Sequence, residues 1–104
     1  MAHKYHAVPT AVDGYRFASQ REARYYQNLK LLEKAGAIQD LELQPVFPLV
    51  VNGVVIGKYV ADFRYVDCET GEVVTVDVKG FRTKEYKLKK RLVEALYPVQ
   101  IVEI

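Results

Sequence analysis

The stretch of sequence that decides the fold is KYVADFRYVDCETGEVVTVDVK, which runs from Lys58 to Lys79. Its two ends, Lys58–Val66 and Glu72–Lys79, are rich in valine and aromatic residues and show the alternation of β-strands. Between them, residues 68–71 (CETG) have the composition of a turn. We therefore expect an antiparallel hairpin in which alternate side chains share a face.

Two aspartates interrupt the apolar pattern of this hairpin. If the turn is centred between Glu69 and Thr70, the numbers of paired residues sum to 139, and Asp62 lies opposite Asp77. Opposed carboxylates repel, and a divalent cation between them converts this repulsion into binding. A three-residue turn with a bulge at Gly71 would shift the register by one residue and send Asp62 to the other face. The sequence leaves both registers open.

Asp77 and Lys79 are alternate residues at the end of an apolar strand, so they stand on one face about 7 Å apart. A buried Asp or Lys is costly unless it is paired or binds a metal. For an isolated Asp-x-Lys, an ordinary ion pair at a partly exposed strand end is the more frequent explanation. Asp62 on the preceding strand favours a chemical site instead.

A third acid, Glu22, opens a predicted helix. Ser19-Gln20-Arg21-Glu22 fits the capping-box pattern, which gives Glu22 a structural role. The same residue also lies on a stripe at helical spacing that should face the core, formed by Tyr25, Tyr26, Leu29 and Leu32. Three acids with one lysine suit a hard, oxygen-liganded cation such as Mg²⁺.

Working outward, the patterns predict six elements. They are a helix from Ser19 to Ala35, strands at Gln44–Val51, 54–66 and Glu72–Lys79, a helix capped by Thr83 and running to about Leu96, and a strand at Val99–Ile104. The order helix-strand-strand-strand-helix-strand predicts one α/β (α+β) domain with a mixed central sheet over residues 15–104. Residues 1–14 are expected to be a polar arm that ends in the turn signal Asp13-Gly14. The second helix should bury a stripe of Leu88, Leu92, Ala95 and Leu96.

Composition excludes several classes of protein. The chain has 104 residues, half of them hydrophobic, and its longest apolar run, Val46–Val51, is far below the about 20 residues of a membrane span. A single cysteine, Cys68, makes no internal disulfide and no cysteine-based zinc site. His3 and His6 lie in the predicted arm and are poor metal-site candidates. We expect no membrane association, a cytoplasmic location, and a small core for which a homodimer is reasonable.

Basic residues concentrate between Lys79 and Arg91, where seven stand against the single acid Glu85. A solvated helix face explains such a run, and so does a phosphate-binding strip.

The ordered set of Glu22, Asp62, Asp77 and Lys79, followed by a basic helix, resembles the PD-(D/E)XK nuclease superfamily. More specifically, the chain is similar from Asp13 to Ile104 to a compact branch found in phage and prophage genomes. The segments that carry this second resemblance are DGYRFAS (13–19), LQP (43–45), YVADF (59–63) and DVKG (77–80). Ala61 stands where the motif's name has proline.

The resemblance implies a restriction-endonuclease-like fold and Mg²⁺-dependent hydrolysis of DNA phosphodiester bonds, with Mn²⁺ as a substitute, leaving a 5′-phosphate and a 3′-hydroxyl. It implies Asp62 and Asp77 as metal ligands, Glu22 acting directly or through water, and Lys79 orienting or deprotonating the attacking water. Gln44 would line the site, or alternatively make a structural hydrogen bond at a strand edge. The implied DNA-binding residues are Ser19, Arg82, Thr83, Lys84, Lys87, Lys90 and Arg91.

A domain this small has little surface for reading bases, which favours structure-selective cutting of a four-way junction, flap or nick site in phage DNA recombination or processing. A viral or host partner protein would be another source of specificity, and in a phage protein the location would be the host cytoplasm. Two alternatives stay open: a DNA-binding module without catalysis, and a viral assembly or interaction protein that uses its eight tyrosines at an interface.

Overall fold

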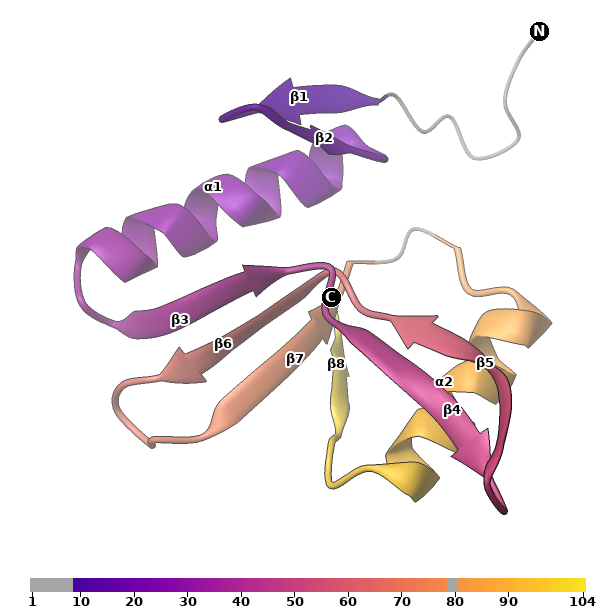
Figure 1. Ribbon diagram of the computed structural model, residues 1–104. Coiled ribbons are helices and arrows are strands. Elements are labelled where there is room, and N and C mark those ends of the chain that lie inside the picture. Colours follow the sequence, from indigo (N-terminus) through magenta and orange to yellow (C-terminus); the bar gives the residue numbers. More distant parts are fainter. Residues whose placement is uncertain (1–8, 79–80) are drawn as a thin grey trace, which may run out of the picture.

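The computed structural model describes residues 9–78 and 81–104, and Figure 1 shows how the elements are arranged. Lys79, His3 and His6 lie outside the described residues. In the described part, no helix is long and apolar enough to cross a membrane. The elements are β1 (Thr10–Val12), β2 (Tyr15–Phe17), α1 (Gln20–Lys34), β3 (Ile38–Leu43), β4 (Val46–Val51), β5 (Val54–Val60), β6 (Phe63–Asp67), β7 (Val73–Asp77), α2 (Lys84–Leu96) and β8 (Ile101–Glu103).

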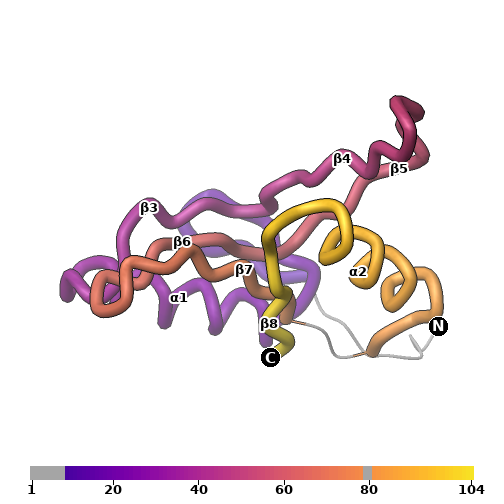
Figure 2. Tube along the Cα trace, turned by 90° about the horizontal axis from the view of Figure 1, so that it is seen from below, coloured from indigo at the N-terminus to yellow at the C-terminus, as the bar shows by residue number. Residues whose placement is uncertain are grey.

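A four-stranded sheet with the order β3-β6-β7-β8 forms the centre of the domain. β6 is antiparallel to β3 and to β7, whereas β8 is parallel to β7, so the sheet is mixed. α1 lies along one face of this sheet, and α2 packs against the separate ribbon of β4 and β5 (Figures 1 and 2). The predicted class, a single α+β domain with a mixed sheet, is confirmed.

The β6–β7 hairpin has the register that brings the two aspartates together. Phe63 pairs with Val76, and the numbers of all paired residues sum to 139. Beyond this pair the ladder ends, and the N–H of Asp62 donates to the Val76 carbonyl and to Asp77 Oδ1, each at 3.1 Å, so the two aspartates adjoin there. The alternative register, shifted by a bulge in the turn, is excluded.

The single strand predicted over residues 54–66 is wrong, because the chain breaks at Ala61 and Asp62 into β5 and β6. The N–H of Ala61 donates to the Pro45 carbonyl at 3.1 Å, whereas the N–H of Asp62 donates to the Val76 carbonyl at 3.1 Å. Between these two residues the backbone therefore leaves the ribbon with β4 and joins the sheet with β7. Asp62 stands at this crossing point.

Residues 38–43 form β3, a strand that the sequence patterns did not predict. Asp40 has a φ of 56°, and the pairing with β6 shifts between Gln39 and Glu42. This bulge breaks the alternation on which strand prediction depends. Gln44 follows with a φ of 52°, so the predicted strand Gln44–Val51 begins two residues later, at Val46.

Both helices begin at the predicted capping residues. The N–H of Glu22 donates to the Ser19 hydroxyl at 3.1 Å, and the N–H of Tyr86 donates to the Thr83 hydroxyl at 3.0 Å. Leu32 was expected in the core and is 44% exposed, because the buried side of α1 runs through Ala23, Tyr26 and Leu29.

The buried stripe predicted for α2 is also wrong. Three of its four members are exposed, Leu88 at 65%, Leu96 at 39% and Ala95, whereas Leu92 packs against the core as predicted and Val93 is fully buried. α2 carries apolar residues on two sides, and the side with Tyr86, Val93 and the following Tyr97 meets the ribbon. On this side of the helix, the ring centroids of Tyr59 and Tyr86 lie 6.2 Å apart.

The core has two parts. One lies between α1 and the central sheet and contains Phe17, Ala23, Tyr26, Leu29, Ile38, Phe63, Val76 and Val78. The other lies between the ribbon, α2 and β8 and contains Phe47, Leu49, Tyr59, Ala61, Val93 and Ile101. The crossing point at Asp62 separates the two parts, since Ala61 belongs to one and Phe63 to the other.

The predicted arm, residues 1–14, contains a strand from Thr10, since β1 pairs with β2. Their turn is Asp13-Gly14, as predicted, with positive φ at both residues. The Tyr26 hydroxyl donates to Asp13 at 3.0 Å, which fastens this hairpin to α1.

Candidate functional site

Asp62 and Asp77 are joined through the backbone. The N–H of Asp62 donates to Asp77 Oδ1 at 3.1 Å, and the N–H of Val78 donates to Asp62 Oδ2 at 2.7 Å. Each carboxylate therefore accepts a main-chain hydrogen bond from the opposite side of the hairpin, which fixes its direction. Asp77 is fully buried, and Asp62 is 8% exposed. Two carboxylates in so dry a place need compensating positive charge or protonation.

Glu22 reaches the same region from α1. It is buried, at 6% exposure, in the first turn of the helix, next to the Ser19 cap. Glu22, Gln44 and Asp62 line one cavity of about 300 Å³. The capping role and the inward position predicted for Glu22 thus coexist.

Gln44 enters this cavity because of its left-handed backbone. Its N–H donates to the carbonyl of Asp62 at 2.9 Å, which anchors the bend between β3 and β4 beside the crossing point. The main-chain N–H of Gln44 therefore makes a structural hydrogen bond, as the alternative expected. Gln44 also lines the cavity.

Arg16 is a cavity residue that the sequence analysis did not assign. It lies in β2 and lines the cavity together with Glu22, Gln44 and Asp62. A guanidinium beside carboxylates is the group that would receive a phosphate brought to them. The sequence did contain a signal for Arg16, because this residue belongs to the DGYRFAS segment that carries the family resemblance.

The acids do not form a compact three-ligand cluster in the described residues, where no group of three or more His, Cys, Asp or Glu side chains is placed to hold a metal ion. Mg²⁺ does not require one, because it commonly binds one or two carboxylates and retains several waters. Asp62 and Asp77, with all-oxygen donors and a shared backbone contact, fit that requirement. Lys79, the fourth member of the predicted set, lies outside the described residues.

The basic residues in and just before α2 differ in their surroundings, and Lys89 pairs with Glu85 at 3.1 Å. Lys84, Lys87 and Arg91 are exposed and lie on one side of the helix at helical spacing. Arg82 and Lys90 turn inward to Glu103 on β8, at 2.8 Å and 3.7 Å. Ser19 and Thr83 serve as N-caps. Only Lys84, Lys87 and Arg91 therefore form an exposed basic row of the kind predicted for DNA binding.

Glu103 accepts two hydrogen bonds and forms a longer ion pair with Lys90 beside the candidate site. In addition to Arg82, the Tyr86 hydroxyl donates to it at 2.9 Å. Burial alone would raise the pKa of Glu103, but the hydrogen bonds from Tyr86 and Arg82 and the charge of Lys90 lower it below its usual value. Burial first, and then the hydrogen bond to Glu103, raise the pKa of Tyr86 well above its ordinary range. Glu103 pairs in register with Asp77, so the network borders the carboxylates.

Comparison with known proteins gives one family. No curated protein matches the chain. A family model with the description "Protein of unknown function (DUF1064)" matches residues 2–102, which is nearly the whole chain. The chain therefore belongs to the DUF1064 family.

Proposed function

We propose that this protein is a Mg²⁺-dependent DNA endonuclease of the PD-(D/E)XK type, structure-selective and acting in phage DNA recombination or processing. The observation that carries the proposal is the interlocked pair of buried carboxylates, Asp62 and Asp77, at the point where the chain crosses from the ribbon to the central sheet. An ordinary surface ion pair would not place both acids in the interior.

The residues around the pair have the chemistry that the proposal needs. Asp62 and Asp77 would hold the metal ion, with Glu22 acting directly or through water. A bound Mg²⁺ would polarise the scissile phosphate and lower the pKa of a bound water. Arg16 would bind a phosphate oxygen. The family resemblance implies that Lys79, which lies outside the described residues, would orient the attacking water.

DNA would approach along the exposed row of Lys84, Lys87 and Arg91. Contacts of this kind neutralise phosphates and position the duplex, but they carry little sequence information. They agree with cutting that depends on the shape of the DNA rather than on its sequence.

The direct test uses fluorescent four-way junction, flap and plain duplex DNA, incubated with Mg²⁺ or with EDTA. The parent protein should cut a branched substrate only with Mg²⁺, and Asp77→Ala should cut none, with circular dichroism confirming that the variant is folded. Binding without cutting, unaffected by metal or by Asp77→Ala, would overturn the catalytic proposal.

That contrary result would support the second candidate, a DNA-binding module without catalysis, which the exposed basic row of α2 favours. Loss of both cutting and binding would favour an assembly or interaction protein.

We also propose that two copies associate through the outer face of the β4–β5 ribbon. The pairs Val46–Val60 and Val50–Val55 lie on this face, and the four side chains are 53%, 37%, 40% and 68% exposed in that order. The ribbon projects from the rest of the molecule (Figure 2). An apolar face of this kind suits a self-complementary twofold contact, and two sites are needed to cut two strands together.

A further inference from the structure

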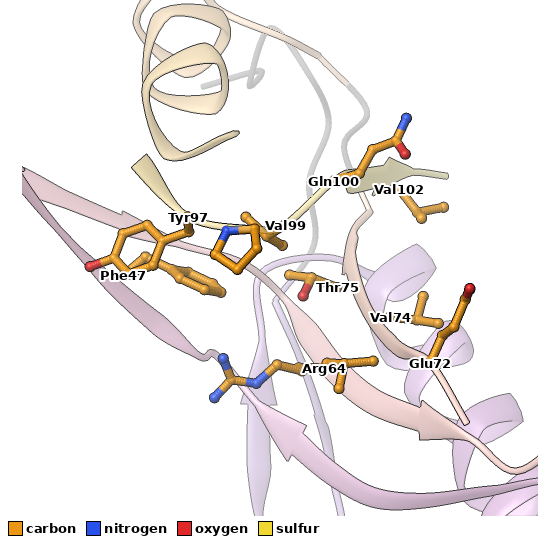
Figure 3. Close-up of a pocket in the computed structure, with 11 residues that line it drawn as sticks. Phe47, Arg64, Glu72, Val74, Thr75, Tyr97, Val99, Gln100 and Val102 are labelled. Atoms are coloured by element: carbon orange, nitrogen blue, oxygen red, sulfur yellow. The ribbon is translucent and has the colours of Figure 1, made fainter. Parts of the chain in front are cut away.

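A second cavity lies on the central sheet, at the start of β8 (Figure 3). Its volume is about 460 Å³, within the range of pockets that hold small organic groups. Its walls come from β4, β6, β7 and the segment that follows α2. The residues that matter for its chemistry are Phe47, Arg64, Thr75, Tyr97 and Gln100.

Thr75 forms the floor of this cavity and is 1% exposed. Its hydroxyl is buried and has no hydrogen-bond partner among the described residues. Figure 3 shows the hydroxyl directed toward the side on which Arg64 lies. Buried polar groups are nearly always hydrogen-bonded, and valine would fill the same space without a polar atom. An unsatisfied hydroxyl on the floor of a cavity therefore points to a polar atom of a ligand.

Two aromatic rings form one wall. The Phe47 and Tyr97 centroids are 5.3 Å apart with an interplanar angle of 70°. The Tyr97 hydroxyl donates to the Pro48 carbonyl at 2.6 Å, which holds the ring in place. The wall is thus fixed before a ligand arrives. Phe47 is 7% exposed and supports the half-buried Tyr97, whose ring offers contact area to another flat ring.

The charges of the cavity select against an anion. Arg64 donates from Nη2 to both carboxylate oxygens of Glu42 at 2.8 Å, so its charge is already compensated. Its guanidinium carbon also lies 5.4 Å from the centre of the Phe47 ring. Glu72 adds a negative charge on the wall. A phosphate would meet no uncompensated cation here, whereas an uncharged heterocycle would meet an aromatic ring and a hydroxyl.

We propose that this cavity binds one unpaired nucleobase of the DNA substrate, with the Thr75 hydroxyl bonded to a polar atom on the base edge. The inference rests on the proposed nuclease function. Thr75 and Asp77 are alternate residues of β7, so their side chains leave the same face of the strand about 7 Å apart. A base in the cavity would therefore lie on the same face of β7 as Asp77, one of the two carboxylates.

Base capture would explain selectivity for DNA structure. In intact duplex the bases are stacked and paired, and extruding one has an energetic cost that a flap, a junction or a single strand largely avoids. Stacking on aromatic side chains is tolerant of base identity. The cavity would thus favour branched DNA without reading its sequence.

The test is an amide NMR titration of the ¹⁵N-labelled chain with uncharged deoxyadenosine or thymidine, in the presence of EDTA and without any DNA cutting. We expect saturable shifts at Thr75, Val99 and Gln100. Inorganic phosphate should not shift these signals. Thr75→Val should weaken nucleoside binding at least about fivefold, and Thr75→Ser, which retains the hydroxyl, should restore it.

Shifts that are absent, or that are unchanged in Thr75→Val, would overturn the proposal. Shifts by phosphate at the same residues would overturn it as well, in favour of an anion site. Because the titration needs neither metal nor cleavage, its failure leaves the nuclease proposal standing. Conversely, an Asp77→Ala protein that cuts DNA normally would remove the nuclease function without changing the nucleoside titration.

Discussion

Asp62 and Asp77 each accept a main-chain hydrogen bond, so their carboxylates have fixed directions before any ligand binds. Their identities were predictable from the sequence, but their proximity was not, because the alternation and the CETG turn leave two registers open and only one of them brings the carboxylates together. The position of Gln44 was predictable only in part. Its place in the cavity depends on a left-handed φ, and no pattern in the sequence indicates this conformation. Arg16 was overlooked because β2 has only three residues.

Replacing Asp77 by asparagine keeps an oxygen that can accept the Asp62 N–H but removes the charge. We expect cleavage to fall by at least about a hundredfold, the order of the effect when one charge-stabilising group is removed. Single-turnover rates on a branched substrate measure it. Asp67→Asn, at the end of β6 beside the turn of the same hairpin, is the matched control and should retain the parent rate. Equal losses in both variants would indicate damage to the hairpin.

Thr75→Val should stabilise the protein, because it removes a buried hydroxyl that has no partner among the described residues. The expected gain is about 1 kcal/mol in the free energy of unfolding, or a rise of roughly 4–8 °C in Tm for a domain of this size. Thermal unfolding by circular dichroism measures the change. A lower Tm would mean that the hydroxyl is satisfied in solution.

At the scale of elements, prediction succeeded where local signals were strong and failed where packing chose between faces. The caps Ser19 and Thr83 fixed the starts of both helices. β3 was not predicted, because the bulge at Asp40 interrupts the alternation of its side chains. α2 offers two apolar sides, and the choice between Leu88 and Val93 follows from contacts with β4, β5 and β8 that are distant in sequence.

The exposed row of α2 should account for much of the salt dependence of DNA binding. Substituting Lys84, Lys87 and Arg91 by alanine should reduce the slope of log K against log salt by about 0.9 for each phosphate that is no longer neutralised. Fluorescence anisotropy over a salt series measures the slope. Lys30→Ala, on the exposed side of α1, is the control and should leave the slope unchanged. If the triple variant has the same slope as the parent, the DNA does not bind along the exposed row of α2.

The lowered pKa of Glu103 leads us to expect that the stability of the fold depends on pH. Its pKa is lowered from 4.5 in the folded protein, so its contribution is present above that value and is lost as the pH falls through the lower folded pKa. Glu103→Gln should therefore lose less stability than the parent on acidification below about pH 4.5. Urea unfolding at neutral and acidic pH measures this, with the exposed Glu85→Gln as control. Parallel losses in all three proteins would contradict the lowered pKa.

At the scale of the whole molecule, one candidate site and one projecting apolar ribbon favour a dimer that brings two sites together. The sequence shows the composition of the ribbon, but not that it leaves the central sheet, because the break at Ala61–Asp62 falls inside one continuous strand pattern. Likewise, the parallel register of β7 and β8, which brings Glu103 beside Asp77, depends on a crossover that local patterns do not specify.

A charge on the ribbon should prevent this association. Val55→Lys places an ammonium group on a side chain that is 68% exposed, so the monomer should fold normally while the dimer no longer forms. Multi-angle light scattering measures the mass, and Leu88→Lys on α2 is the control. A parent that is monomeric at all concentrations, or a Val55→Lys protein that remains dimeric, would reject the ribbon as the interface.

The central claim is that Asp62 and Asp77 bind a divalent cation. The most direct measurement is an amide NMR titration with Mn²⁺, whose paramagnetism broadens nearby signals. We predict selective loss of the Asp62 and Val78 signals at low Mn²⁺, their recovery on addition of excess Mg²⁺, and no selective loss in Asp77→Asn. Signals that persist in the parent protein, or broadening that Asp77→Asn leaves unchanged, would contradict the claim and leave the carboxylates with a structural role.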